Sequence, residues 1–417
     1  MSATLASRGL LVTRPGRGSY TTARRPQISH SDLGWQTLAL GSRPGLPTEL
    51  EDLLAPTPPG LLPLVSAFLD EGLQPLGLLA AAAARAARRP YGWSRSPAEG
   101  LEELRAYLAG EAGSSYQVEN VIVTPGGQAA LAACCRYLAT PGDPIVVESP
   151  TYIGARVAAR CAGLIPIPVP TDRDGVLPDA LAEALARSRA RLIYLQPRHA
   201  NPTGATLAAE RRPAVLEIIH RAGAFLIEDD WVRDLDLDGP TPPPLASLDD
   251  DGHVIYLRSL TKPVAAGLRV AALIARGPVL TRLNRGRITD DLFVAPVLQH
   301  IALDVLTAPG WPRHLAGLRK ALRLRRDTLT TAVAASLPDC ELHLKPTGGV
   351  HLWLRLPQGT SDTDLTAAAL RHGVAVSPGP AYFPAEPPSP HLRLSYAAAN
   401  PATLQHATAR LATALSE

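Results

Sequence analysis

Residues 191–230, RLIYLQPRHANPTGATLAAERRPAVLEIIHRAGAFLIEDD, contain one complete unit of the fold. A short apolar strand at 191–195 (RLIYL) is followed by a helical pattern at 210–222 and by a second apolar strand at 224–228 (AFLIE). Continuous apolar strands joined by a helix are typical of neighbouring parallel strands that are covered on both faces. This stretch therefore predicts an α/β fold.

The same alternation continues on both sides of this unit and predicts a large domain built on a mostly parallel sheet. Further apolar strands are expected at 120–124, 144–148, 164–169, 254–257 and 271–275, and further helices at 128–138, 153–161 and 178–188. After residue 280 the pattern becomes helical, and strands at 341–344, 350–356 and 392–395 predict a second, smaller α/β domain. We predict a large domain over residues 65–300 and a small C-terminal domain over residues 301–417.

The composition is that of a globular protein. Hydrophobic residues make up 46% of the 417 residues and charged residues 19%, so disorder of the whole chain is not expected. No apolar run is long enough to cross a membrane, and the N-terminus lacks the basic-then-apolar order of a signal peptide. We expect a cytoplasmic protein without a membrane partner. The net charge of +3 gives no general reason to expect nucleic acid as a partner.

Lysine is rare in this chain. Lysine and arginine together number 41, and only Lys262, Lys320 and Lys345 are lysines, so the other 38 are arginines. Arginine stays protonated in proteins, whereas a lysine whose pKa is lowered can act as an amine nucleophile. Lys262, which closely follows the strand at 254–257, is therefore a candidate for amine chemistry.

Polar residues gather where the predicted strands end, which is the edge at which parallel α/β sheets bind their ligands. In chain order they are Gly126, Gly127, Gln128, Tyr152, Asn201, Asp229, Asp230, Ser259, Thr261, Lys262, Arg269 and, within the last strand, Arg393. The glycines open a helix, whose free N–H groups favour an anion such as phosphate. Together the set supplies an anion cradle, a flat stacking surface, a carboxylate, an amide, one lysine and a distant arginine. An aldehyde cofactor with a phosphate tail and a pyridine ring needs these groups.

Each of these features has an ordinary explanation when it stands alone. A Gly-Gly pair before a helix is usually a plain turn, and the Asn-Pro-Thr-Gly sequence at 201–204 is usually no more than that. Paired aspartates often cap a helix, and Arg393 could be a surface charge. The order of the features and their placement at strand ends favour the cofactor site.

Seven motifs carry a resemblance to a known family. They are YGWSRSPAEGLEELR (91–105), VTPGGQAAL (123–131), ESPTY (148–152), NPTG (201–204), IEDDW (227–231), SLTKPVAAGLR (259–269) and HLRLSYA (391–397). With these motifs the chain resembles the fold-type I pyridoxal-phosphate enzymes of aminotransferase class I/II, and most of all the aminotransferase-like half of MocR-type proteins. The resemblance spans roughly residues 65–415. It implies pyridoxal 5′-phosphate as cofactor, an amino acid and a 2-oxo acid as substrates, no metal, and a homodimer.

The resemblance also implies a role for each matching residue. Lys262 would form a Schiff base with the cofactor aldehyde and later move a proton. Asp229 would pair with the pyridine nitrogen, Tyr152 would stack on the ring, and Asn201 would bond its phenolic oxygen. Arg393 would bind the α-carboxylate of the substrate. Tyr91 would reach the phosphate from the neighbouring subunit. The other residues that would hold the phosphate are Gly126, Gly127, Gln128, Ser259, Thr261 and Arg269.

The sequence departs from the family at one position. Relatives usually place a tyrosine two or three residues after the pyridine-binding aspartate, where it bonds the phenolic oxygen. Here those positions hold Trp231 and Val232, and an indole offers only an N–H donor. Decarboxylation, elimination or other chemistry at Cα would use the same core residues, so these reactions stay open beside transamination.

The N-terminal residues give a second, weaker resemblance. The sequence GLLVTRPGRGSY at residues 9–20 resembles the β-wing that ends a GntR-type winged-helix domain. A whole winged helix needs about 60–70 residues, including a recognition helix, and residues 1–64 have room only for a remnant of the wing and a proline-rich linker. We therefore expect an enzyme that does not bind DNA. The alternative is a MocR-type transcription regulator that uses the cofactor as an effector sensor.

Overall fold

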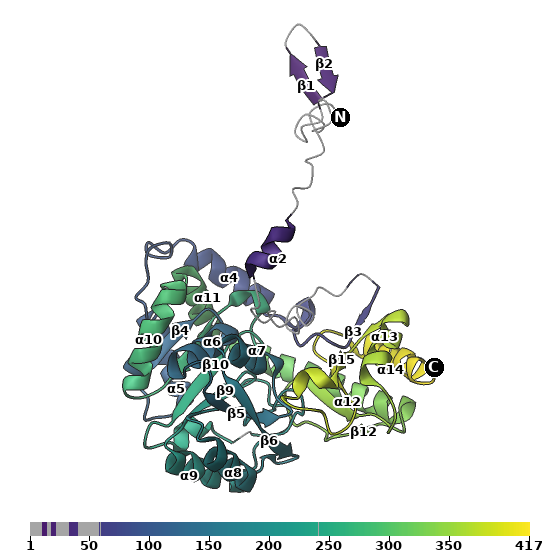
Figure 1. Cartoon of the computed structure of the whole chain (residues 1–417). Helices are drawn as coiled ribbons and strands as arrows, with labels where there is room; N and C mark the ends of the chain where they lie inside the picture. The colour runs from purple at the N-terminus through teal and green to yellow at the C-terminus, as the bar shows by residue number, and fades with distance from the viewer. Residues whose placement is uncertain (1–10, 15–17, 22–32, 41–57, 59, 241) are drawn as a thin grey trace. The chain divides into compact units, whose positions relative to one another are not determined.

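The structure is a computed structural model, and it describes residues 11–14, 18–21, 33–40, 58, 60–240 and 242–417 (Figure 1). The chain divides into two units, residues 1–46 and residues 47–417. Among the described residues, no helix has both the length and the apolar character that crossing a membrane requires.

The first unit contains a β-hairpin. Strands β1 (Leu11–Arg14) and β2 (Gly18–Thr21) pair antiparallel, with Leu11 opposite Thr21, and helix α2 (Gly34–Leu40) follows. The two strands overlap residues 9–20, where the sequence predicts a wing, and residues 9, 10 and 15–17 of that stretch lie outside the described residues. Most of the predicted linker before residue 64 lies outside the described residues.

The second unit is built on an eight-stranded sheet, in the order β4-β11-β10-β9-β8-β5-β6-β7. Its strands are β4 (Val121–Thr124), β5 (Pro144–Ser149), β6 (Ile165–Asp172), β7 (Gly175–Val176), β8 (Leu192–Leu195), β9 (Phe225–Asp230), β10 (Val254–Ser259) and β11 (Ala271–Ile274). The run from β10 through β9, β8 and β5 to β6 is parallel, whereas β11 and the short β7 pair antiparallel with their neighbours. The predicted α/β fold with a mostly parallel sheet is confirmed.

Helices cover both faces of this sheet because the strand residues alternate between two cores. Tyr194 and Ile227 belong to one core, with helices α6 (Gly127–Leu138), α7 (Ile153–Cys161) and α10 (Pro278–Asp291). Ile193 and Leu226 belong to the other, with helices α5 (Glu102–Ala112), α8 (Pro178–Ser188) and α9 (Arg212–Ala222). Helix α9 ends at Gly223, whose φ of +59° is left-handed and suits a residue without a Cβ. Two further helices, α4 (Leu76–Ala86) and α11 (Pro296–Leu306), pack on each other.

A second sheet, of four strands, lies with helices α12 (Trp311–Ser336), α13 (Asp362–Arg371) and α14 (Pro401–Leu415), coloured light green to yellow in Figure 1. Its order is β12 (Glu341–Leu342), β13 (His351–Arg355), β16 (His391–Ser395), β15 (Ser377–Pro378), and β14 (Val374–Ala375) pairs with β3 (Leu62–Pro63). Short 3-10 turns lie at Glu71–Leu73, Val118–Asn120, Ala209–Arg211, Leu245–Leu248, Ala266–Leu268 and Gly379–Tyr382. Helix α11 runs through the predicted domain boundary at residue 300.

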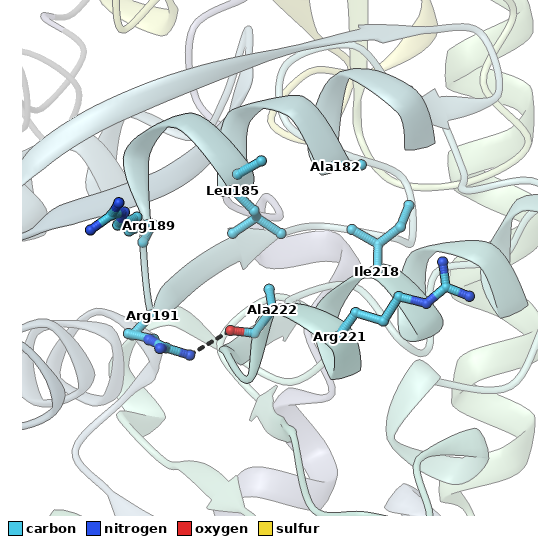
Figure 2. Close-up of a pocket in the computed structure, with 9 residues that line it drawn as sticks. Ala182, Leu185, Arg189, Arg191, Ile218, Arg221 and Ala222 are labelled. Atoms are coloured by element: carbon cyan, nitrogen blue, oxygen red, sulfur yellow. Dashed lines mark hydrogen bonds between the residues drawn. The ribbon is translucent and has the colours of Figure 1, made fainter.

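A shallow groove lies between α8 and α9, at the amino ends of β8 and β9 (Figure 2). Leu185 and Ile218 line its floor, and three arginines surround it, Arg189, Arg191 and Arg221. A larger cavity of this unit lies at the opposite, carboxyl ends of the strands.

Candidate active site

A cavity of about 610 Å³ opens at the carboxyl ends of the parallel strands. Eleven of the twelve strand-end residues were predicted to hold cofactor or substrate, and the cavity gathers most of them. Its lining consists of Ala67, Phe68, Gly127, Gln128, Leu131, Tyr152, Gln196, Asn201, Asp229, Trp231, Ser259, Thr261, Lys262, Ala266, Gly267, Arg269 and Arg393. Segments far apart in sequence therefore meet here, as the strand-end argument expects.

The start of helix α6 forms an anion cradle. Gly126 precedes the helix with φ +99°, and a Cβ at this position would collide with the Arg269 guanidinium. Arg269 donates to Thr261 Oγ1 over 3.4 Å and to the Pro125 carbonyl over 3.3 Å. Free backbone N–H groups, a guanidinium and a hydroxyl thus converge on one point, which suits a phosphate.

Lys262 is three residues beyond strand β10 and lines the cavity. Burial lowers the pKa of its ammonium group from the ordinary 10.5 to about 7. The positive charges of Arg393 and Arg269 act in the same direction, whereas the Asp229 carboxylate opposes them. The Lys262 amine is therefore substantially neutral near neutral pH, as a nucleophile must be.

Asp229 is the next-to-last residue of β9, and its side chain is held from the neighbouring strand β8. Tyr194 Oη and Gln196 Nε2 both donate to Asp229 Oδ2, over 2.6 Å and 3.0 Å. Burial raises the pKa of Asp229 to about 6, and these two hydrogen bonds oppose the rise. Both donors use the same oxygen, so Oδ1 is left for a protonated ring nitrogen.

Tyr194 and Gln196 are absent from the predictions made from the sequence. Tyr194 lies within β8, and Gln196 is the first residue after that strand ends at Leu195. A tyrosine in an otherwise apolar strand, followed two residues later by a glutamine, is the signal that the sequence offers. Gln196 also accepts from the Asn201 backbone N–H through Oε1, over 2.9 Å, which connects Asp229 to the Asn201 loop.

Arg393 and Asn201 form a connected pair. Arg393 Nη1 donates to Asn201 Oδ1 over 3.2 Å, and Arg393 Nη2 donates to the Val65 carbonyl over 2.7 Å. The Arg393 side chain is fully buried, and its Nε has no hydrogen-bond partner among the described residues. Such a group calls for a buried anion. Since Asn201 Oδ1 accepts from Arg393, the Asn201 amide N–H group is the part that can donate to a ligand.

Tyr152 begins helix α7 and lines the cavity next to Gln128. Its hydroxyl donates to Gln128 Oε1 over 3.1 Å, and Gln128 Nε2 donates to the Gly154 carbonyl over 2.9 Å. The Gln128 side chain therefore fixes the Tyr152 hydroxyl, a role in addition to the predicted backbone contact with phosphate.

Trp231 lines the cavity and stands at one of the two sequence positions where the resemblance leads one to expect a tyrosine. Its indole Nε1 donates to the His199 carbonyl over 3.2 Å, so this N–H is already engaged. The Trp231 ring stacks on His351, with ring centroids 5.3 Å apart. Val232 is fully buried in the core. Neither residue replaces the missing tyrosine as a donor, so Asn201 is the donor that remains for a phenolic oxygen.

Asp230 and Tyr91 lie outside the cavity lining. Asp230 Oδ2 accepts from Tyr256 Oη over 2.6 Å, and Asp230 Oδ1 is 3.2 Å from Arg198 Nε, which gives it a place in a buried ionic network. Tyr91 is 77% exposed. Of the predicted site residues that lie outside the cavity lining, Tyr91 is the exposed one.

Three observations fit pyridoxal 5′-phosphate. The glycine cradle beside Arg269 suits the phosphate, the free oxygen of Asp229 suits a protonated pyridine nitrogen, and the neutral amine of Lys262 suits the aldehyde. The unpartnered Nε of Arg393 is left for the α-carboxylate of a substrate.

Comparison with known proteins agrees with this site. The family model described as aminotransferase class I and II matches residues 67–411. A 2-aminoadipate transaminase of Thermus thermophilus is 32% identical over 86% of this chain and 90% of its own length. The HTH-type transcriptional regulator YdfD of Bacillus subtilis is 28% identical over 73% of this chain, which spans 65% of the regulator. The crystal structure of LysN, an α-aminoadipate aminotransferase from Thermus thermophilus in complex with N-(5′-phosphopyridoxyl)-L-leucine, superimposes with a TM-score of 0.81 and 30% identity, covering 89% of this chain and 97% of LysN.

Proposed function

The chain belongs to the class I and II aminotransferase family, and we propose that it transfers an amino group from an amino acid to a 2-oxo acid. We also propose a role for each residue of the cavity in this reaction. The resemblance inferred from the seven motifs is thereby confirmed, together with the fold and the cofactor. Bound pyridoxal 5′-phosphate supplies an aldehyde that captures amines and a protonated ring that stabilises negative charge at Cα. The side chains of the protein would bind and orient the reactants and move the protons.

Lys262 is the nucleophile and the proton carrier. Its lowered pKa, about 7, leaves a neutral amine that would hold the cofactor through its aldehyde. With a substrate bound, the same Lys262 nitrogen would move a proton to and from the substrate Cα. A group with a pKa close to the working pH suits both directions of this transfer.

Asp229 keeps the ring nitrogen protonated. Its Oδ1 would bind that nitrogen, while Tyr194 and Gln196 hold Oδ2 and favour the ionised carboxylate. Burial in a low dielectric strengthens the attraction between this carboxylate and a cationic ring. Asn201 donates to the phenolic oxygen, Tyr152 covers one face of the ring, and the cradle of Gly126, Gly127, Gln128, Ser259, Thr261 and Arg269 holds the phosphate.

Arg393 binds the substrate α-carboxylate. Its Nη2 is fixed by Val65 and its Nη1 by Asn201, so the guanidinium is oriented before the substrate arrives. This orientation would place the substrate Cα in the cavity that also contains the Lys262 amine. Preorganisation of this kind lowers the barrier because the geometry of reaction is set in advance.

The observation that supports this proposal most strongly is the Lys262 amine in one cavity with Asp229 and Arg393. The test uses purified protein saturated with pyridoxal 5′-phosphate and single amino acids. We expect the visible absorbance of the lysine-bound cofactor to convert to that of the pyridoxamine form. Lys262→Ala should abolish the visible band, and Lys320→Ala, which removes an exposed lysine of α12, is the matched control. A band that survives in Lys262→Ala would refute the assignment of this lysine.

A homodimer completes the site in this proposal. Tyr91 is 77% exposed and Trp93 is 73% exposed, and such a pair of aromatic side chains suits a surface covered by a second subunit. Tyr91 would then reach the phosphate bound by its partner. Mixed dimers of Tyr91→Ala and Lys262→Ala subunits should regain activity, because one of their two sites contains both residues. No gain of activity on mixing would show that Tyr91 does not act across the interface.

We propose the cytoplasm as the location of the protein.

A second candidate function rests on the N-terminal hairpin. Strands β1 and β2 match the predicted wing, and YdfD is named a transcriptional regulator. A regulator would bind the cofactor without turning over amino acids. Failure of every amino acid to convert the bound cofactor, together with sequence-specific DNA binding by the protein carrying any segment encoded in frame upstream of Met1, would favour this alternative.

A further inference from the structure

Phe68 lies directly over the reactive amine. Lys262 Nζ is 3.8 Å from the centroid of the Phe68 ring, and both residues line the same cavity. In the function proposed above, on which this inference rests, the substrate nitrogen takes the place of Lys262 Nζ. The substrate Cα is one bond from that nitrogen and Cβ is two bonds away. The first atoms of the substrate side chain must therefore come close to the Phe68 ring.

The segment that carries Phe68 also helps to hold the carboxylate-binding arginine. The Val65 carbonyl accepts from Arg393 Nη2 over 2.7 Å, and the Leu64 carbonyl accepts from the Ser395 backbone N–H over 2.7 Å. These bonds tie the segment to strand β16, in which Arg393 lies. The position of Phe68 is thus fixed relative to the guanidinium that would orient the substrate.

The cations that line the described cavity are all accounted for. Lys262 is the amine, Arg269 belongs to the phosphate cradle, and Arg393 faces the α-carboxylate. Ala67, the neighbour of Phe68 in the chain, also lines the cavity. Trp231 is a further aromatic residue of the lining, and its N–H donates to a carbonyl. No cation of the described lining is left to pair with a second carboxylate.

We propose that Phe68 is a specificity-determining residue and that this site selects amino acids with uncharged, apolar side chains over dicarboxylic amino acids. An apolar side chain gains by burial against an aromatic ring. A carboxylate in the same place would lose its water without gaining a cation, which is costly. Phe68 therefore both attracts the first kind of substrate and disfavours the second.

The test compares two substrates of equal length on the enzyme saturated with cofactor. L-norleucine and L-2-aminoadipate have the same six-carbon chain and differ in the terminal group, which is a methyl in one and a carboxylate in the other. We expect kcat/KM for conversion of the bound cofactor to be at least about 100-fold higher with L-norleucine. Equal or faster conversion by L-2-aminoadipate would overturn the proposal.

Variants of Phe68 test whether this residue is responsible. Phe68→Ala should raise the KM for L-norleucine about tenfold relative to that for L-alanine, because L-alanine buries only one methyl group against the ring. Phe68→Leu restores apolar volume and should keep the ratio within about threefold of the wild type. The visible absorbance of the bound cofactor checks that each variant folds. An unchanged ratio in Phe68→Ala would show that another residue selects the substrate.

A binding measurement separates this inference from the proposed function. Hexanoate and adipate repeat the comparison without an amine, and calorimetry on the cofactor-saturated protein measures their affinities. We expect hexanoate to bind at least about tenfold more tightly. If neither amino acid reacts but hexanoate is preferred, the proposed function fails and the role of Phe68 stands. If adipate binds as tightly or more tightly, the role of Phe68 fails whatever the enzyme does.

Discussion

Strands β8 and β9 have a hollow at each end, and both hollows contain three basic side chains. At the amino ends the groove between α8 and α9 is surrounded by arginines (Figure 2), and at the carboxyl ends the cavity contains one lysine and two arginines. The former are Arg189, Arg191 and Arg221, and the latter are Lys262, Arg269 and Arg393. The number of positive charges is therefore the same, and it does not decide which hollow is the active site.

The difference lies in burial and in unmet hydrogen bonds. Arg191 is exposed and donates to two carbonyls at the end of α9, those of Ala222 and Gly223, and Arg221 pairs with Glu217 on the surface. Arg393, by contrast, is fully buried with Nε unpartnered among the described residues. An exposed guanidinium whose N–H groups already donate to the carbonyls of a helix end stabilises that helix. A buried guanidinium with an N–H group that has no partner is suited to binding a ligand.

Asp229→Asn, at the carboxyl ends of the strands, should lower the activity more than any other substitution considered for these two hollows. The substitution keeps the shape of the side chain but removes the charge that holds the ring nitrogen protonated. We expect kcat/KM in the half-reaction with an amino acid to fall at least about 100-fold. Glu217→Gln, which removes the exposed α9 carboxylate that pairs with Arg221, is the control and should leave the rate unchanged. Asp229→Asn activity close to the wild type would remove Asp229 from the proposed mechanism.

Arg393→Lys should give the next largest effect. Lysine keeps the charge but loses the planar fork that binds a carboxylate through two hydrogen bonds. We expect the KM for the amino acid to rise about 10- to 100-fold, with a smaller change in kcat, in steady-state kinetics. Arg191→Lys makes the same exchange in the groove and should change neither constant. Similar effects from the two variants would contradict the distinction drawn between the two ends.

The pH dependence of cofactor binding tests the burial of Lys262. Burial lowers the pKa of this amine from 10.5 to about 7, so the amine is neutral above pH 7 and protonated below it. The rate at which the cofactor-free protein captures pyridoxal 5′-phosphate, followed by stopped-flow absorbance, should level off above pH 7. Below pH 7 it should fall about tenfold per pH unit. A rate that keeps rising towards pH 10 would indicate an amine with an ordinary pKa.

Tyr194→Phe should have a moderate effect at the carboxyl end. It removes one of the two donors to Asp229 Oδ2, and since this hydrogen bond lowers the pKa of Asp229, the pKa should rise. We expect kcat/KM to fall about tenfold at pH 7 and the acidic limb of the pH profile to move to higher pH. Tyr256→Phe is the matched control, because its hydroxyl donates to Asp230, outside the cavity. A shift of the acidic limb in Tyr256→Phe but not in Tyr194→Phe would contradict the assignment of this limb to Asp229.

The sequence predicted the parts of the molecule that follow a local pattern. The apolar strands at 191–195 and 224–228 correspond to β8 and β9, because buried parallel strands have continuous apolar runs. Lys262 stood out because lysine is rare and arginine cannot perform its chemistry. Helix α14 was not predicted, although Asn400 caps it and Pro401 begins it.

The missed residues of the cavity depend on contacts between distant segments. Phe68 meets Lys262 across nearly two hundred residues, and Tyr194 and Gln196 matter only because β9 is the neighbour of β8. A single sequence indicates where a strand lies, but it does not show which strand pairs with it or in which register. These contacts could therefore be found only in the structure. The placement of the Trp231 N–H on the His199 carbonyl likewise depends on how two loops meet.

Arg191→Ala should have the smallest effect and completes the comparison at the amino end. The exposed guanidinium donates to two carbonyls at the C-terminus of α9, and interactions of a cation with a helix C-terminus contribute about 0.3–1 kcal/mol when they are exposed. We expect the free energy of unfolding, measured by denaturant titration, to fall by no more than about 1 kcal/mol, and kcat/KM to stay unchanged. Addition of salt should weaken this contribution in the wild type because exposed charges are screened. A loss of activity in Arg191→Ala without a loss of stability would mean that the groove takes part in function, and the two ends of β8 and β9 would then no longer differ in the way described.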